Sequence, residues 1–359
     1  MEYKNEKACF IINKKIVIVF SLLILFFYKR NINIMFFFSK NFGDNLNYFL
    51  LKDMINGNVN FYDSDLSNAN SISCDSYYST KLNEISKIDF FFIGSILERI
   101  CSWSYVFHNQ NNIYKTIISK LYFKIFDYFY PLIIFGTGFI SYPKFKHETY
   151  IRNIKIIATR GNISLQRFKN NGIKPSGKVI LADPGILAPL LVNITNINEI
   201  KIKKKFKLCV IPHYIDMNIK LIKKRIHIKN FVILNINNNP LLFIKSISKC
   251  NNVLSSSLHG LIIADSLGIP NMRIVISNNV KGGDYKYIDY YSGYNLKLPH
   301  KIDLRKTIFS YKDLKNLREN HFIQEDIIKN KQCDLLLNFP FKLSTKYQYF
   351  KKILCNNIY

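Results

Sequence analysis

The stretch N-V-L-S-S-S-L-H-G-L-I-I-A-D-S-L-G-I-P, residues 252–270, decides the fold. Its apolar residues 253 and 254 predict a buried strand, and the three serines that follow are typical of a turn into a helix. His259 and Gly260 then open a segment with apolar residues at helical spacing, which a glycine and a proline end. The pattern therefore predicts a histidine on the first turn of a helix, directly after a strand.

A histidine in this position lies where open α/β sheets bind their ligands. The free N–H groups of a helix start favour an anion, and the helix dipole disfavours the charged form of an adjacent imidazole. We predict that His259 is an acid or a hydrogen-bond donor beside a bound anion. A histidine that only caps the helix and packs the sheet edge is the alternative.

The same alternation of strand, polar strand end and helix repeats along the chain. Strands are predicted at residues 34–38, 88–93, 132–135, 154–159, 179–181, 208–211, 231–235, 253–254 and 272–276. Helices are predicted at 46–54, 163–170 and 240–249. Such alternation indicates parallel sheets with right-handed crossovers. The predicted fold class is α/β, with two Rossmann-like domains and a cleft between them that would bind a ligand.

The polar, basic stretch 193–207 separates the two halves. The predicted divisions are an apolar extension at 1–33, an N-terminal domain at 34–195, a C-terminal domain at 205–300 and a mainly helical tail at 301–359. The apolar core of the extension is shorter than the roughly 20 residues that span a bilayer. It is predicted to anchor the chain, to lie on a membrane surface, or to precede an internal start at Met35.

The composition of the chain limits which partners, metal sites and disulfides are expected. The net charge of +27 comes almost entirely from lysine spread along the chain. Arginines, which recognise phosphates and base edges better, are few, so we exclude nucleic acid as a partner and retain attraction to anionic membranes or substrates. No histidine and cysteine cluster has metal-ligand spacing. The seven cysteines are scattered without a C-x-x-C pair, which predicts reduced thiols in a cytoplasmic protein.

Polar and glycine residues at the ends of predicted strands supply further candidates for binding. They are Asn41, Gly43, Asp44, Gly136, Gly138, Arg160, Asp183, His213 and Asp289. Arg160 is predicted either to grip a carboxylate or phosphate or to bond a helix end. Asp44 is a helix cap or a ligand for sugar hydroxyls, whereas Asp289 is a helix start or a site edge. Gly136-Thr-Gly138 lacks the G-x-G-x-x-G pattern, so dinucleotide binding is not supported.

Motifs in order along the chain resemble one family, the polysaccharide pyruvyl transferases. The matching pieces are NFGDNLN (41–47), FFIGS (91–95), FGTG (135–138), ATRGNISL (158–165), ADPGIL (182–187), IPH (211–213), SSSLHGLIIADSLGIP (255–270) and KYIDYY (286–291). Together they span roughly residues 35–295, and their order makes the resemblance fairly specific.

The resemblance implies a fold like the GT-B glycosyltransferases. It also implies transfer of pyruvate from phosphoenolpyruvate onto two hydroxyls of one sugar as a cyclic ketal, with release of phosphate and without a cofactor. The acceptor would be a surface polysaccharide, such as capsule, exopolysaccharide or lipopolysaccharide, or its lipid-linked precursor. His259 would be the acid or a phosphate ligand, Arg160 would hold the donor, and backbone groups near Leu258 and Gly260 would assist.

One position departs from the family. Some members carry an arginine immediately before Leu-His, where this chain has Ser257, so Lys281 and Lys286 are candidates to replace that contact. Two alternatives stay open from the sequence. One is a GT-B glycosyltransferase that uses a nucleotide sugar, and the other is a non-catalytic sugar-binding or membrane scaffold protein.

Overall fold

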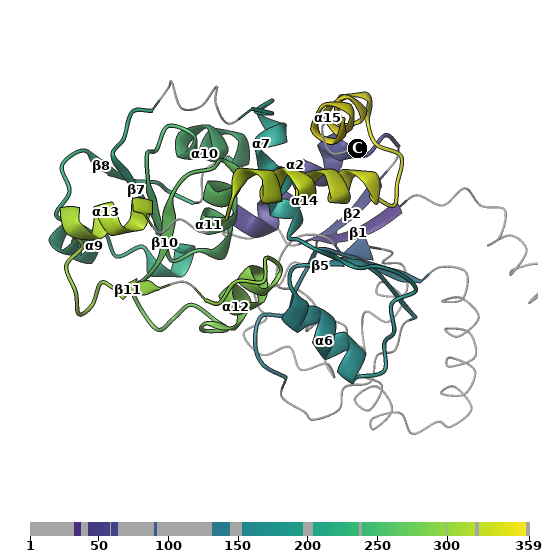
Figure 1. Ribbon diagram of the computed structural model, residues 1–359, viewed down its shortest axis with the longest axis horizontal. Helices are drawn as coiled ribbons and strands as arrows, with labels where there is room; N and C mark the ends of the chain where they lie inside the picture. The colour runs from purple at the N-terminus through teal and green to yellow at the C-terminus, as the bar shows by residue number, and fades with distance from the viewer. Residues whose placement is uncertain are drawn as a thin grey trace, which may run out of the picture. The chain divides into compact units, whose positions relative to one another are not determined.

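The computed structural model describes most of the chain beyond the N-terminal extension (Figure 1). The described residues are 32–36, 42–57, 59–63, 90–91, 131–143, 153–196, 204–236, 239–298, 300–319 and 323–356. Residues from Asn33 onward belong to one compact unit. Within the described ranges, no helix is both long enough and apolar enough to cross a membrane.

The first half of the chain builds a sheet in the order β2-β1-β3-β4-β5-β6. Its strands are Ile32–Phe36 (β1), Val59–Asp63 (β2), Phe90–Phe91 (β3), Leu132–Phe135 (β4), Ile154–Thr159 (β5) and Ile180–Leu181 (β6). The pairings from β1 through β3, β4 and β5 to β6 are parallel, as the alternating pattern predicts. Strand β2 is a strand that the sequence pattern did not reveal.

Helices of this half follow the strands closely. They are Phe42–Met54 (α2), Asn162–Asn170 (α6) and Ala188–Leu191 (α7), with a 3-10 turn at Pro184–Leu187 (η2). The two longer helices confirm the helices predicted at 46–54 and 163–170, and each begins earlier than its apolar pattern. The residues added to α2 are Phe42, Gly43, Asp44 and Asn45, and α6 gains Asn162. Apolar periodicity therefore places the start of each helix too late.

The second half builds a sheet in the order β11-β10-β9-β7-β8. Its strands are Leu208–Ile211 (β7), Phe231–Ile233 (β8), Val253–Ser255 (β9), Asn271–Val275 (β10) and Lys301–Asp303 (β11), and all their pairings are parallel. Strand β7 is flanked by β8 on one side and β9 on the other, so the connections leave it in opposite directions. This is the 2-1-3-4-5 order of a doubly wound sheet, whose ligand crevice lies between the first and third strands.

The helices of the second half are Ile219–Arg225 (α9), Pro240–Ile247 (α10), Leu258–Ser266 (α11) and Tyr285–Ser292 (α12), with a 3-10 turn at Tyr214–Asp216 (η3). One apolar core runs under this sheet and includes Val210, Leu254 and Ile274 from its central strands. Every residue of α11 is buried, because the helix is apolar all round. The helix that decides the fold is therefore an interior element.

The C-terminal residues extend the second sheet and then return to the first half of the chain. We predicted the second domain to end at 300, but β11 adds three residues to its sheet. Helix Tyr311–Glu319 (α13) follows, and then Glu325–Leu337 (α14) and Thr345–Cys355 (α15), drawn in yellow, lie next to each other (Figure 1). Lys331 on α14 donates a hydrogen bond to the Leu181 carbonyl, and Lys346 on α15 pairs with Asp53 at 2.6 Å.

Four cysteines form two disulfides, which corrects the prediction of reduced thiols. Cys209 on β7 is joined to Cys250, and Cys333 on α14 is joined to Cys355 on α15. The partners lie 41 and 22 residues apart in sequence, so no local motif announces them. The fold brings them within 5.8 and 5.4 Å between Cα atoms, a normal disulfide span. The other three cysteines lie outside the described residues.

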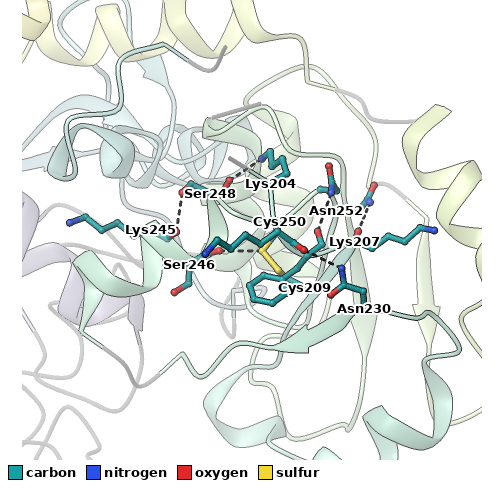
Figure 2. Close-up of a disulfide and its surroundings, with 12 residues drawn as sticks. Lys204, Lys207, Cys209, Asn230, Lys245, Ser246, Ser248, Cys250 and Asn252 are labelled. Carbon is teal, nitrogen blue, oxygen red and sulfur yellow. Dashed lines mark hydrogen bonds between the residues drawn. A yellow bond between two sulfur atoms is a disulfide. The ribbon is translucent and has the colours of Figure 1, made fainter. Parts of the chain in front are cut away.

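The Cys209–Cys250 disulfide lies in a region already held by hydrogen bonds (Figure 2). The Asn252 side chain donates to the Lys207 carbonyl at 2.7 Å, and the Lys204 ammonium donates to the Ser248 carbonyl at 3.1 Å. These bonds connect the segment that enters β7 with the segment that enters β9. The disulfide therefore fixes the two strands that flank the ligand crevice.

Replacing Cys209 and Cys250 together by alanine is expected to lower the free energy of unfolding by about 2–4 kcal/mol, because a disulfide restricts the unfolded chain. Urea unfolding without reductant measures this difference. Mass spectrometry of unreduced, alkylated peptides is the control, and it should find the two cysteines linked. Full alkylation of both thiols in the unreduced protein would contradict the pairing.

Candidate functional site

Two strand ends meet at the crevice of the second sheet. After β7 the chain continues into Pro212 and His213, and after β9 it continues into Ser256 and Ser257. The Ile211 carbonyl accepts hydrogen bonds from the Ser256 N–H and the Ser255 hydroxyl. The His213 N–H donates to the Ser256 hydroxyl oxygen at 2.9 Å. The serine run therefore joins the two strand ends into one structure.

His259 is the second residue of α11, as the sequence predicts, and lies in the interior at 6% exposure. Its Nε2 atom is buried and has no hydrogen-bond partner among the residues that the structure describes. Ser257 is the N-cap and Leu258 the first residue of the helix, so the unpaired N–H groups of the first turn surround the imidazole. A buried polar atom without a partner calls for a ligand or a water.

Gly260 is needed for the close approach of α11 to β9. A Cβ atom at this position would lie 2.4 Å from the Ser255 hydroxyl oxygen, which itself donates hydrogen bonds to two carbonyls. Any side chain here would push the helix and His259 away from the strand end. The glycine of the L-H-G motif therefore acts on the position of the helix.

Asp183 lies beside His259 at the start of η2. One carboxylate oxygen, Oδ1, accepts the Gly185 N–H at 2.8 Å, and the other, Oδ2, is buried without a partner in the described part of the chain. A Cβ added at Gly185 would lie 3.0 Å from Asp183 Oδ1 and 3.6 Å from His259 Cδ2, so both side chains flank this glycine. Gly185 thus lies between two residues from the two halves of the chain, each of which has one unmatched polar atom.

Burial drives the protonation of these groups toward their neutral forms. Desolvation raises the pKa of Asp183 to about 7, although the Gly185 N–H and the Arg160 charge oppose the shift. Desolvation lowers the pKa of His259 to about 3, and Arg160, Lys286 and His213 lower it further. The pKa of His213 also falls to about 3, because of burial and the Lys286 charge. At neutral pH both imidazoles are therefore uncharged hydrogen-bonding groups.

Arg160 and Asp289 form a fully buried ion pair. The Arg160 Nε and one terminal nitrogen each lie 2.9 Å from Asp289 Oδ2, and neither side chain is exposed. Arg160 also donates to the Phe139 carbonyl, while the Ser164 N–H and hydroxyl donate to Asp289. The sequence offered donor gripping or a helix contact for Arg160, and the structure shows this arginine bound within the protein. Asp289 is not a helix start, since it lies inside α12, and its role as a site edge stays a prediction.

Two glycines make room for this ion pair. A Cβ at Gly138 would lie 2.5 Å from the Arg160 guanidinium carbon, and a Cβ at Gly161 would lie 1.6 Å from the Asp289 carbonyl oxygen. Gly136 also lies close to other protein atoms, because Pro184 is packed against it at a position with φ of +80°. Substrate binding by Gly136 and Gly138 stays a prediction.

The remaining predicted residues differ in position. Gly43 and Asp44 lie in the first turn of α2, and Asn41 lies outside the described residues. Lys281 and Lys286 were the candidates to replace an arginine at position 257. Lys281 is exposed in a turn, whereas Lys286 is buried on α12. The charge of Lys286 lowers the pKa values of His213 and His259. Of these two lysines, Lys286 is therefore the one whose charge acts near the start of α11.

Sequence reasoning missed the hydrogen-bonding partners of the site. Ser164 receives no attention from pattern analysis, yet it bonds to Asp289 and also accepts the Phe139 N–H. Tyr287 donates its hydroxyl to the Ser256 carbonyl at 2.7 Å. The A-T-R-G-N-I-S-L and K-Y-I-D-Y-Y motifs contain both residues, so their presence within motifs was the available signal.

Comparison with known proteins places these observations in a family. The sequence model described as "Polysaccharide pyruvyl transferase" matches residues 41–278. "Uncharacterized protein L143" of Acanthamoeba polyphaga mimivirus is 28% identical over 214 residues, which cover 57% of this chain and 70% of that protein. The solved structure of the wall teichoic acid polymerase TagF aligns at 12% identity over 57% of each chain. Its TM-score is 0.28, a likeness that carries no argument about the fold.

The titration of Asp183 gives a test of the site's electrostatics. Its folded pKa of about 7 exceeds the ordinary 3.8, so its contribution to stability is full below about pH 4 and is lost as the pH rises toward 7. The side-chain amide of the Asp183→Asn variant does not titrate and retains an acceptor for the Gly185 N–H. We therefore expect the free energy of unfolding of Asp183→Asn, relative to the natural protein, to rise by a few kcal/mol between about pH 4 and pH 8.

Urea unfolding at both pH values measures this difference. The control is Asp326→Asn, because Asp326 is exposed in the first turn of α14. Its difference from the natural protein should change little between the two pH values. A flat difference for Asp183→Asn would contradict the raised pKa.

Proposed function

The chain belongs to the polysaccharide pyruvyl transferase family, and we propose that it transfers pyruvate from phosphoenolpyruvate to two hydroxyls of one sugar. The sugar belongs to a surface polysaccharide or its lipid-linked precursor, and phosphate is released. The observation that carries this proposal is that His259 and Asp183, which both flank Gly185, each have one buried polar atom without a partner among the described residues, Nε2 and Oδ2. No metal or organic cofactor takes part in the proposed reaction.

The start of α11 supports an anionic donor. The helix contributes unpaired N–H groups and the positive end of its dipole. The charges of Arg160 and Lys286 both act on His259, which lies in the first turn of this helix. In a low-dielectric interior, such N–H groups and charges act strongly on a phosphate or carboxylate. Lys286 takes the part that the missing arginine at position 257 plays in other members of the family.

Protonation states assign the acid and the base. The donor's CH2 carbon must receive a proton, which gives a methyl group and an electron-poor carbon that a sugar hydroxyl attacks. Asp183 holds a proton up to about pH 7 and is the proposed acid. Because burial keeps His259 neutral, we assign it the acceptance of the hydroxyl proton instead of the acid role predicted from sequence. Its lowered pKa makes it a weak base until an anion binds beside it.

The second hydroxyl then displaces phosphate and closes the ketal. The phosphate leaves with the proton of that hydroxyl. The proton that His259 accepted from the first hydroxyl returns to Asp183, so atoms and charges balance across the reaction. A phosphate bound near α11 would raise the pKa of His259, because an adjacent anion stabilises the imidazolium. The substrate itself would thus make the imidazole a better proton acceptor.

His259→Asn should lower the rate of ketal formation about 10²- to 10⁴-fold, because it removes the proposed base. The assay combines the protein, phosphoenolpyruvate and lipid-linked saccharides from its own pathway, and NMR detects the acid-labile pyruvate ketal. Asp326→Asn is the matched control and should keep full activity. Absence of ketal with every pathway acceptor contradicts pyruvyl transfer, and nucleotide release from a nucleotide sugar would instead support a glycosyltransferase.

The rate should fall as the pH rises through about 7, because Asp183 is active in its protonated form. The profile of kcat/KM against pH, measured with saturating acceptor, tests this. Asp183 would lose its proton over roughly pH 6 to pH 9. A kcat/KM that increases steadily over that range would rule out Asp183 as the acid.

A further inference from the structure

A polar cavity lies at the carboxyl edge of the second sheet. Its volume is about 210 Å³. The lining includes Asp216, Ser256, Arg273, Tyr287, Asp303 and Arg305. We call it the Asp216 cavity. It lies on the side of the sheet where doubly wound folds bind ligands, and none of the residues that the sequence predicts to bind substrate is part of its lining.

Each positively charged side chain that lines this cavity is already paired with a carboxylate. Arg273 and Lys301 both pair with Asp284, at 2.6 and 2.7 Å, and Arg305 pairs with Asp303 at 2.6 Å. With Asp216, the described lining therefore carries three positive and three negative groups. A lining without excess charge does not select a phosphate dianion. It suits a neutral ligand that both donates and accepts hydrogen bonds.

Asp216 points to hydroxyl groups on that ligand. The residue is 2% exposed, and its Oδ1 accepts a hydrogen bond from the Ser277 hydroxyl. Its Oδ2 is buried and accepts no hydrogen bond from any described residue. An ionised carboxylate has several acceptor positions, and leaving one buried oxygen unmatched costs free energy. A ligand O–H group would satisfy it.

The aromatic face in the cavity is already covered. The Arg273 guanidinium carbon lies 3.8 Å from the centre of the Tyr287 ring, and the Tyr287 hydroxyl is bonded to the Ser256 carbonyl. Arg273 thus covers a face of the Tyr287 ring, and Ser256 holds its hydroxyl group. The ring is therefore not free for a ligand to stack on. Recognition in this cavity depends on hydrogen bonds.

We propose that the Asp216 cavity binds a sugar ring through its hydroxyl groups, with Asp216 accepting from them. This inference rests on the proposed function, in which the ring belongs to the acceptor. Ser256 connects the two places, because it lines the cavity while its hydroxyl oxygen accepts the His213 N–H. A bound sugar would then lie one residue along the chain from the cap of α11. The diol of a ribose has the same chemistry, so a nucleotide is the competing source of that ligand.

The test is binding to the full-length protein, measured by saturation-transfer NMR and calorimetry with methyl pyranosides and, separately, a nucleoside diphosphate. We expect a pyranoside to bind at millimolar concentration and Asp216→Asn to weaken it about 10- to 100-fold, because the variant replaces an acceptor by a donor. Asn278→Leu, at an exposed lining residue, is a second variant that avoids the buried carboxylate and should also weaken binding. Asp326→Asn is the control and should bind as the natural protein does.

Several outcomes would overturn the inference. The first is that no pyranoside binds. The second is that both lining variants bind a pyranoside as well as the natural protein does. The third is that a nucleoside diphosphate binds instead and that Asp216→Asn abolishes this binding. Ketal formation distinguishes this failure from failure of the proposed function. If Asp216→Asn forms ketal with an unchanged KM for the acceptor, the cavity assignment fails and pyruvyl transfer stands. If pyranosides bind through Asp216 but no ketal forms, the cavity stands and pyruvyl transfer fails.

Discussion

The ion pair between Arg160 and Asp289 is the constraint on which the candidate site depends. It joins the end of β5 to α12 across 129 residues of sequence, with neither side chain exposed. Removing two charges from water costs several kcal/mol per ion, so such a pair persists only when its remaining hydrogen-bonding capacity is used. Ser164 and the Phe139 carbonyl supply that capacity here. The pair is therefore better understood as fixing a geometry than as a source of stability.

The same burial shifts the pKa values of the two groups proposed to transfer protons. Loss of water raises the pKa of Asp183 to about 7 and lowers that of His259 to about 3, so both are mainly neutral at a pH somewhat below 7. An acid and a base with shifts in opposite directions are what a proton-transferring site requires. Neither shift needs a special residue, since both follow from placing polar groups beside an apolar helix. The Arg160 charge acts on both groups as well, which links the buried ion pair to the chemistry.

Sequence patterns predicted the local elements well and their pairing poorly. Strands β4, β5 and β7 and the start of α11 follow from apolar runs bounded by polar or glycine residues. Strand β11 has three residues, one of them buried, and gives no periodic signal. The partnership of Arg160 with Asp289, like that of Cys209 with Cys250, depends on strand order. Strand order is a long-range property, so residue types at strand ends could be identified while their contacts could not.

The serines at the end of β9 form the predicted turn into α11 and also bond to neighbouring elements. Ser255 closes the turn through the Ile211 and Ser257 carbonyls, and Ser256 bonds His213 on one side and Tyr287 on the other. The run thus separates the imidazole at the start of α11 from the Asp216 cavity. A reaction that joins a small anion to a neutral sugar needs two unlike environments close together. Three short side chains can form such a partition because they satisfy backbone groups without filling either space, which a longer residue at position 256 would do.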